Sequence, residues 1–203
     1  MSWEFLATAA IVCIMPGTGV VYTLAVSLGR GLRAGLIAAF GCTLGILPHV
    51  AASILGLAAV LHTSAVAFNV LKLADVLYLL WMAWGVWHGA GTLSVRERSE
   101  PVVPLCLIRD GILLNLLNPK LSVFFLAFLP QFVPAAAQDA ALQMIWLAGV
   151  FMAMTFATFA LYGAFAGAVR QRILARPAAM RWMRLTFAGS FTLLGLRLAM
   201  AER

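Results

Sequence analysis

Charged residues are scarce in this 203-residue chain: they make up 10% of it, and only seven are acidic. A soluble domain carries about 25% charged residues. Hydrophobic residues instead reach 64% of the chain, with a mean hydropathy of +1.00. No soluble core needs this much apolar surface, so the scarcity of charge indicates a membrane protein.

Cysteine is also rare, with Cys13, Cys42 and Cys106 each within or at the edge of an apolar block. An odd count without CxxC or Cys/His spacing excludes a disulfide framework and a zinc site. A membrane thiol–disulfide carrier is excluded as well, because Cys13 and Cys106 lie at different depths of their helices. The sequence contains no Ser/His/Asp set, metal cluster or phosphate-binding loop, so we expect neither an enzyme nor a cofactor.

The basic residues give a net charge of +7, but they do not form a patch of the kind that binds nucleic acid. They fall between the hydrophobic blocks, and mostly on alternate loops: Arg30 and Arg33, then Arg96 to Arg109, then Arg170 to Arg184. By the positive-inside rule these odd-numbered loops are cytoplasmic, so both termini are expected outside the cell.

The apolar blocks are each long enough to cross a bilayer as a helix, which takes about 20 residues. Because lipid leaves no other partner for backbone groups, and because the blocks do not alternate as barrel strands would, we predict an all-α membrane protein. Its six transmembrane helices are expected at residues 3–28, 34–61, 65–88, 105–132, 141–169 and 181–200. Residues 1–203 form one domain of two inverted three-helix repeats, at 1–95 and 105–203, joined by a linker at 89–104.

Each predicted half opens with an interrupted helix, at Pro16-Gly17 in the first and at Asn118-Pro119 in the second. Matched breaks in two halves are typical of a transporter binding site, although proline alone also kinks a packed helix. Proline frees a carbonyl one turn earlier. Freed carbonyls suit an ammonium group, and the positive ends of half-helices suit a carboxylate, so together they suit a zwitterion.

Three titratable residues fall inside the predicted spans. Lys120 lies deep, where a lysine costs about 3 kcal/mol, so we expect it to bind a substrate carboxylate beside Asn118 unless its side chain snorkels. His49 can carry a proton near neutral pH, and a satisfied core histidine is the equal alternative. Asp75 is the second candidate for the proton, or simply pairs with Lys72.

Four Gly-x-x-x-Gly pairs predict close helix packing within the chain or between the subunits of a homo-oligomer. They are Gly31/Gly35, Gly41/Gly45, Gly85/Gly89 and Gly163/Gly167.

Several motifs together resemble the LysE/RhtB family of amino-acid exporters, in the right order over essentially the whole chain. They are Pro16-Gly17-Thr18-Gly19, the glycines from Gly29 to Gly45, Leu71-Lys72 with Tyr78-Leu79, Asn118-Pro119-Lys120 and Pro130-Gln131-Phe132. The chain departs from the family pattern at Thr18 and Gly19, at Pro48-His49 and at Asp75. The resemblance and the breaks together predict substrate-binding residues Pro16, Gly17, Thr18, Asn118, Pro119 and Lys120.

The sequence therefore predicts a multi-pass protein of the bacterial inner membrane that exports amino acids or close derivatives as a secondary, proton-coupled transporter. Its expected partners are a small amino-acid-like substrate and the lipid bilayer. A metal-cation exporter on the same scaffold is the alternative, for which His49 and Asp75 are the candidate ligands. A channel or a structural membrane protein is the third interpretation.

Overall fold

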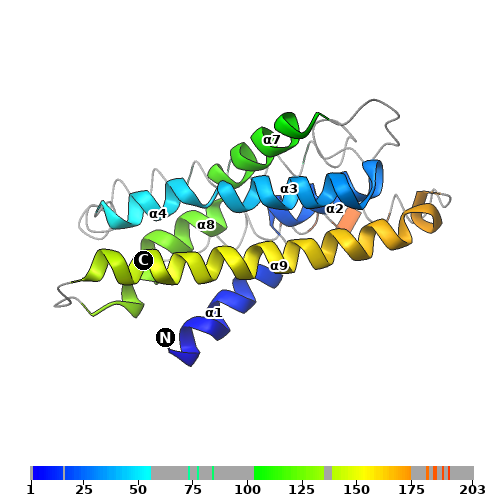
Figure 1. The fold of residues 1–203 in the computed structure, drawn as a ribbon. Helices are drawn as coiled ribbons and strands as arrows, with labels where there is room; N and C mark the ends of the chain where they lie inside the picture. The colour runs from blue at the N-terminus through cyan, green and yellow to red at the C-terminus, as the bar shows by residue number, and fades with distance from the viewer. Residues whose placement is uncertain are drawn as a thin grey trace.

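The computed structural model describes residues 2–15, 17–55, 103–134 and 139–174, together with positions 73, 77, 84, 182, 185, 186, 189 and 192. Every regular element in this part of the chain is a helix, which confirms the all-helical prediction (Figure 1). The third and sixth predicted spans lie almost wholly outside the described residues. So do most of the linker, Pro16, Lys72 and Asp75.

The first predicted span consists of two helices, α1 (Trp3–Ile14) and α2 (Thr18–Arg30). The Ser2 side chain starts α1 by accepting a hydrogen bond from the Phe5 amide at 3.2 Å. The two helices are bent by 49° at the Pro16-Gly17 break. The break predicted from the proline is therefore confirmed.

The second span is formed by α3 (Leu32–Leu44) and α4 (Leu47–Ile54). A single residue, Gly31, separates α3 from α2, and its φ of +89° is a conformation that glycine adopts without a steric penalty. α3 consequently folds back along α2, and Gly35 faces Ser27, each four residues from the turn.

The fourth predicted span is again broken. It contains α7 (Pro104–Leu116), α8 (Pro119–Val123), the π-helix η1 (Phe124–Phe128) and the 3₁₀-helix η2 (Leu129–Phe132). The parts before and after the Asn118-Pro119 break are bent by 57°. The fifth span is the long, straight α9 (Ala140–Leu174).

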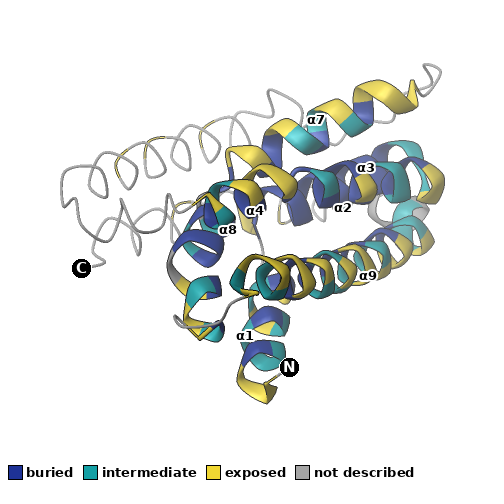
Figure 2. Cartoon of the chain, turned by 60° about the vertical axis from the view of Figure 1, so that its left-hand side comes forward, coloured by how far each residue is buried: buried dark blue, intermediate teal, exposed yellow. Residues whose placement is uncertain are grey.

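Length and composition make Leu32–Ile54 and Ala140–Arg170 candidate membrane spans, and each bent pair adds one more, up to four in the described residues. These four correspond to the first, second, fourth and fifth predicted spans. Large apolar side chains of these spans are exposed, such as Ile11, Leu105, Leu161 and Phe165, as expected for surfaces that meet lipid. Exposed stretches of α7 and α9 are yellow in Figure 2.

Helix α3 lies between α2, α7 and α9. Small residues let the backbones of α3 and α7 approach: a Cβ at Gly41 would lie 2.7 Å from the Cα of Ile108, and one at Gly111 would lie 2.8 Å from the backbone nitrogen of Cys42. Gly45 meets Ile112 in the same way. The prediction that Gly41 and Gly45 serve packing is thus confirmed within one chain. Gly85 and Gly89 lie outside the described residues.

The basic ends of the first and fifth spans lie together. Arg170 on α9 donates from Nε to the Leu28 carbonyl at 2.8 Å and from Nη2 to the Gly29 carbonyl at 3.3 Å. These carbonyls belong to the last turn of α2, where a cation is favoured. The loops carrying Arg30 and Arg170 are therefore on the same end of the bundle, as the alternate-loop pattern requires.

Candidate functional site

The two helix breaks meet at Lys120. Its ammonium donates to the Val12 carbonyl at 2.8 Å and to the Met15 carbonyl at 2.9 Å, across 108 and 105 residues of sequence. In an unbroken helix the Val12 carbonyl would accept from residue 16, but that residue is a proline and has no N–H. The Lys120 ammonium supplies the missing donor. The negative end of α1 also favours a cation at this position.

A second proline-freed carbonyl is satisfied in the reverse direction. The Asn115 carbonyl would accept from residue 119, which is again a proline. The His49 ring lies 3.0 Å from this carbonyl through Nε2, and since a carbonyl only accepts, Nε2 carries the proton. His49 comes from the first half and Lys120 from the second. The Asn115 carbonyl also accepts from the Asn118 amide at 3.1 Å, so His49 is its second donor. Each half thus donates to a carbonyl whose i+4 helical donor is removed by the other half's proline.

A third carbonyl, near the end of the fourth span, also lacks its helical donor because of a proline and accepts from another helix. In the π-helix, the Leu129 amide bonds to the Phe124 carbonyl, five residues back. With the same spacing of five, the Phe125 carbonyl would accept from the amide of residue 130, but that residue is a proline and has no N–H. The Ser53 hydroxyl of α4 donates to it instead, at 2.7 Å.

An asparagine pair connects the Asn118-Pro119 break to α3. The Asn118 side chain caps α8 by accepting from the Lys120 amide at 3.1 Å and donates to the Asn115 side chain at 3.2 Å. Asn115, only 1% exposed, donates in turn to the Cys42 carbonyl of α3 at 2.7 Å. A Cβ at Gly19 would lie 2.5 Å from the Asn115 oxygen, so glycine makes room for this network.

The first residues of α2 face the second half. Thr18 is buried, and its hydroxyl donates to the Leu114 carbonyl at 3.1 Å. Gly17 is the N-cap of α2 and has no side chain to cap the helix. A Cβ at Gly17 would lie 3.2 Å from the Lys120 ammonium nitrogen and 3.6 Å from the Asn118 amide nitrogen. These donors converge on the start of α2.

Helix α9 supplies polar groups that the sequence reasoning missed. The Tyr162 hydroxyl donates to the Ile14 carbonyl at 2.9 Å, and Thr155 lies 3.3 Å from the Cys13 sulfur. Both residues contact the end of α1. Their spacing of seven, two helical turns on a mostly apolar helix, was the available signal. Asn115 was also missed, although it lies one turn before Pro119.

Five of the predicted site residues therefore lie in one network of described residues: Gly17, Thr18, Asn118, Lys120 and the proposed proton carrier His49. Pro119 is the first residue of α8. The predicted Pro16 and Asp75 lie outside the described residues.

The positive charge of Lys120 is stabilised by backbone carbonyls. The ion pair recorded in the described part of the chain, Arg109–Asp110 at 2.8 Å, lies on the outside of α7. Lys120 contacts helix-end carbonyls instead of a carboxylate. In the same residues, no group of three or more His, Cys, Asp or Glu side chains is placed to hold a metal ion.

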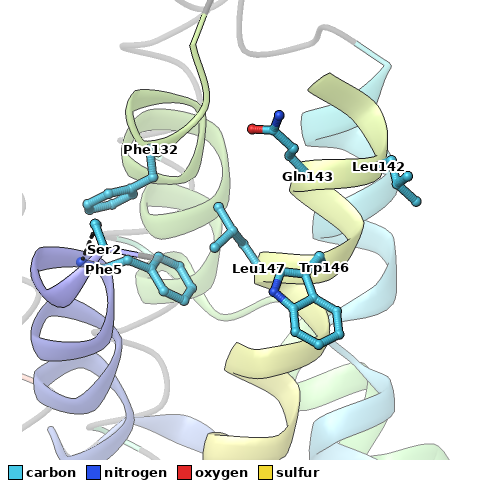
Figure 3. A pocket seen from close by; sticks show the side chains of 7 residues that line it. All are labelled: Ser2, Phe5, Phe132, Leu142, Gln143, Trp146 and Leu147. Atoms are coloured by element: carbon cyan, nitrogen blue, oxygen red, sulfur yellow. Dashed lines mark hydrogen bonds between the residues drawn. The ribbon is translucent and has the colours of Figure 1, made fainter. Parts of the chain in front are cut away.

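A cavity of about 300 Å³ opens at the other end of α1 (Figure 3). Phe5 and Phe132 line one side of it, and Gln143, Trp146 and Leu147 of α9 line the other. Phe124, one turn beyond Lys120, packs on Phe5 and stacks on Phe151, with the two ring centroids of the stacked pair 4.4 Å apart.

Comparison with known proteins covers nearly the whole chain. The family model for the LysE type translocator matches residues 10–202. A homoserine/homoserine lactone efflux protein of Salmonella typhi is 30% identical over 208 residues, covering 98% of this chain and 96% of that protein. A leucine efflux protein of Salmonella choleraesuis is 28% identical over 155 residues, covering 76% of this chain and 73% of that protein.

A membrane protein of Vibrio cholerae is 33% identical over 129 residues, and the match spans 64% of this chain and 63% of that protein, just under two thirds of its length. No solved structure matches the chain.

Proposed function

Because the chain belongs to the family of LysE type translocators, we propose that it is a secondary active exporter of amino acids or close amino-acid derivatives across the bacterial inner membrane. Efflux proteins for leucine and for homoserine and its lactone are among its relatives. The proposed solutes are therefore amino acids or close derivatives about as large as leucine or homoserine. The family and these relatives point to a transporter rather than an enzyme.

The observation that carries this proposal is the meeting of two proline-broken helices at Lys120 and His49. A zwitterion needs donors for its carboxylate and acceptors for its ammonium. Donors at the meeting point are the Lys120 ammonium, the Asn118 amide and the N-terminal turn of α2 at Gly17 and Thr18. Acceptors are the carbonyls that end α1, among them the Val12 carbonyl, whose helical donor is missing because residue 16 is a proline. We propose that Pro119 and these residues form the substrate site.

The proposed transport cycle uses two inverted three-helix halves that rock about this site. The reciprocal donation by Lys120 and His49 fits such a pair of halves, since each half completes the broken helix of the other. The basic end with Arg30 and Arg170 is proposed to face the cytoplasm, and the cavity beside Phe5 to face outward.

Export is tested in cells that overproduce the protein. Compared with empty-vector cells, we expect several-fold more of at least one of leucine, homoserine and homoserine lactone in the medium, measured by mass spectrometry during dipeptide or precursor feeding. Equal release of every amino acid by both strains, with the protein present in the membrane fraction, would contradict the proposed function.

We further propose that a proton is the coupling ion. A zwitterion has no net charge, so the membrane potential alone cannot drive its export unless an ion moves with it. His49 is the first candidate carrier and Asp75 the second. His49→Gln is a sharp test because glutamine keeps an N–H for the Asn115 carbonyl but cannot titrate. In proteoliposomes we expect solute-driven proton movement by His49→Gln to fall to the level of protein-free vesicles. If His49→Gln and Asp75→Asn both keep full coupling, neither residue carries the proton.

A further inference from the structure

The Lys120 ammonium occupies a site built for a cation from elsewhere in the chain. Its two acceptors, the Val12 and Met15 carbonyls, belong to α1, whereas Lys120 belongs to α8. The Val12 carbonyl lacks a helical partner because residue 16 is a proline, and the Met15 carbonyl ends the helix. Both lie at the negative end of the α1 dipole. Any primary ammonium group of suitable size satisfies the same acceptors.

Among the described residues, the Lys120 ammonium has two hydrogen-bond acceptors. It carries three N–H groups, and two of them point to Val12 and Met15. The nitrogen lies beside Gly17, with the Asn118 amide nitrogen close to the same point. A side chain at position 17 would press on the ammonium, and glycine leaves the approach open. A carboxylate reaching the start of α2 would therefore meet Lys120 first.

We propose that the Val12 and Met15 carbonyls are an ammonium subsite that Lys120 holds while no solute is bound. The α-ammonium of the exported amino acid displaces it, and the released Lys120 ammonium then pairs with the carboxylate of the same solute. This inference rests on the proposed function and narrows its solutes to molecules with both a primary ammonium and a free carboxylate, which include leucine and homoserine but not homoserine lactone.

The exchange keeps every group satisfied. Before binding, both carbonyls have Lys120 as their donor, so neither is left without a hydrogen bond. After binding, they have the solute's ammonium, and the displaced lysine charge meets the solute's carboxylate rather than bare hydrocarbon. A solute that lacks the carboxylate would leave Lys120 stranded, so binding of a simple amine is disfavoured in the wild-type protein.

The subsite is tested with amines on detergent-purified Lys120→Ala. This substitution removes three carbons and the nitrogen beyond Cβ, which n-propylammonium replaces. We expect n-propylammonium to raise the melting temperature of Lys120→Ala in a concentration-dependent way and to leave the wild-type protein unshifted. Tetramethylammonium, a cation without N–H donors, should shift neither protein. An equal response of both proteins to n-propylammonium, or none from either, overturns the subsite.

The yield of intact Lys120→Ala, purified with and without n-propylammonium, is a second test of the subsite. Should Lys120→Ala be isolated intact only when n-propylammonium is present during growth and purification, that dependence supports the subsite. Recovery that fails with and without the amine overturns it. These readouts do not depend on which solute is exported, so they fail independently of the efflux experiment.

A reversal of ligand preference tests the exchange itself. With L-leucine and its decarboxylated analogue isopentylamine as probes, the wild-type protein should bind the amino acid more tightly. Lys120→Ala should bind isopentylamine more tightly, because its carbonyls are vacant and the cation for the carboxylate is gone. The same order of preference in both proteins would overturn the proposed displacement.

Discussion

Replacing Lys120 with alanine is expected to reduce solute export to the level of empty-vector cells while the protein still reaches the membrane. The variant loses the cation that the site offers to a carboxylate. It also leaves the part-buried Val12 carbonyl and the more exposed Met15 carbonyl without the Lys120 donor. Export is measured as initial efflux from preloaded cells and normalised to the amount of protein in the membrane.

Arg109→Ala is the matched control for this experiment. Arg109 is a cation of the same half, eleven positions earlier, but its side chain is 66% exposed and pairs with the adjacent Asp110. Its removal should leave efflux close to that of the wild-type protein. If Lys120→Ala exports at the wild-type rate, Lys120 is a structural residue and has no part in binding. If both variants lose export alike, loss of positive charge in general explains the defect.

Substitution of Gly111 by alanine is expected to destabilise the helix bundle strongly, by about 2 kcal/mol or more, because the added methyl group has no space. It would lie 2.8 Å from the backbone nitrogen of Cys42, 3.0 Å from the carbonyl carbon of Gly41 and 3.1 Å from the Ala38 oxygen. All three are backbone atoms, so α3 and α7 must separate to admit it. The effect is measured as a fall in melting temperature and in the yield of monodisperse protein.

Gly149→Ala provides the comparison for Gly111→Ala. Gly149 lies in the interior of α9, and a Cβ there would meet nothing within 4 Å. Alanine is a better helix former than glycine, so this variant should be as stable as the wild-type protein or slightly more stable. A melting temperature for Gly111→Ala equal to that of Gly149→Ala would show that the contact between α3 and α7 is looser than described.

Asn115 shows why part of the site was not predictable. In the sequence it is one polar residue in an apolar run, four positions before a proline. Its side chain is placed by Cys42 of α3, and its backbone carbonyl by His49 of α4. Neither partner is near in sequence. The same holds for Tyr162, whose hydroxyl meets a carbonyl of α1 from 148 positions away.

The predicted alternatives for His49 illustrate the same limit. A histidine within an apolar helix is either a satisfied core residue or a proton carrier, and spacing does not distinguish the two. The structure gives the ring a carbonyl partner that Pro119 has deprived of its helical donor. The partner is known from the fold alone, whereas the transport role remains a proposal.

The sequence by itself determined the membrane-helix class, the positions of four spans now described and the two broken helices. These are consequences of local chemistry: a run of apolar residues is long enough for the bilayer, and a proline has no N–H wherever the chain folds. Only the tertiary structure decided which donor replaces each missing N–H. Lys120 lies against the carbonyls of Val12 and Met15, because α8 packs where α1 ends, and its binding of a substrate carboxylate stays a prediction. Such a pairing depends on the distance between atoms more than 100 residues apart, which residue type and spacing do not specify.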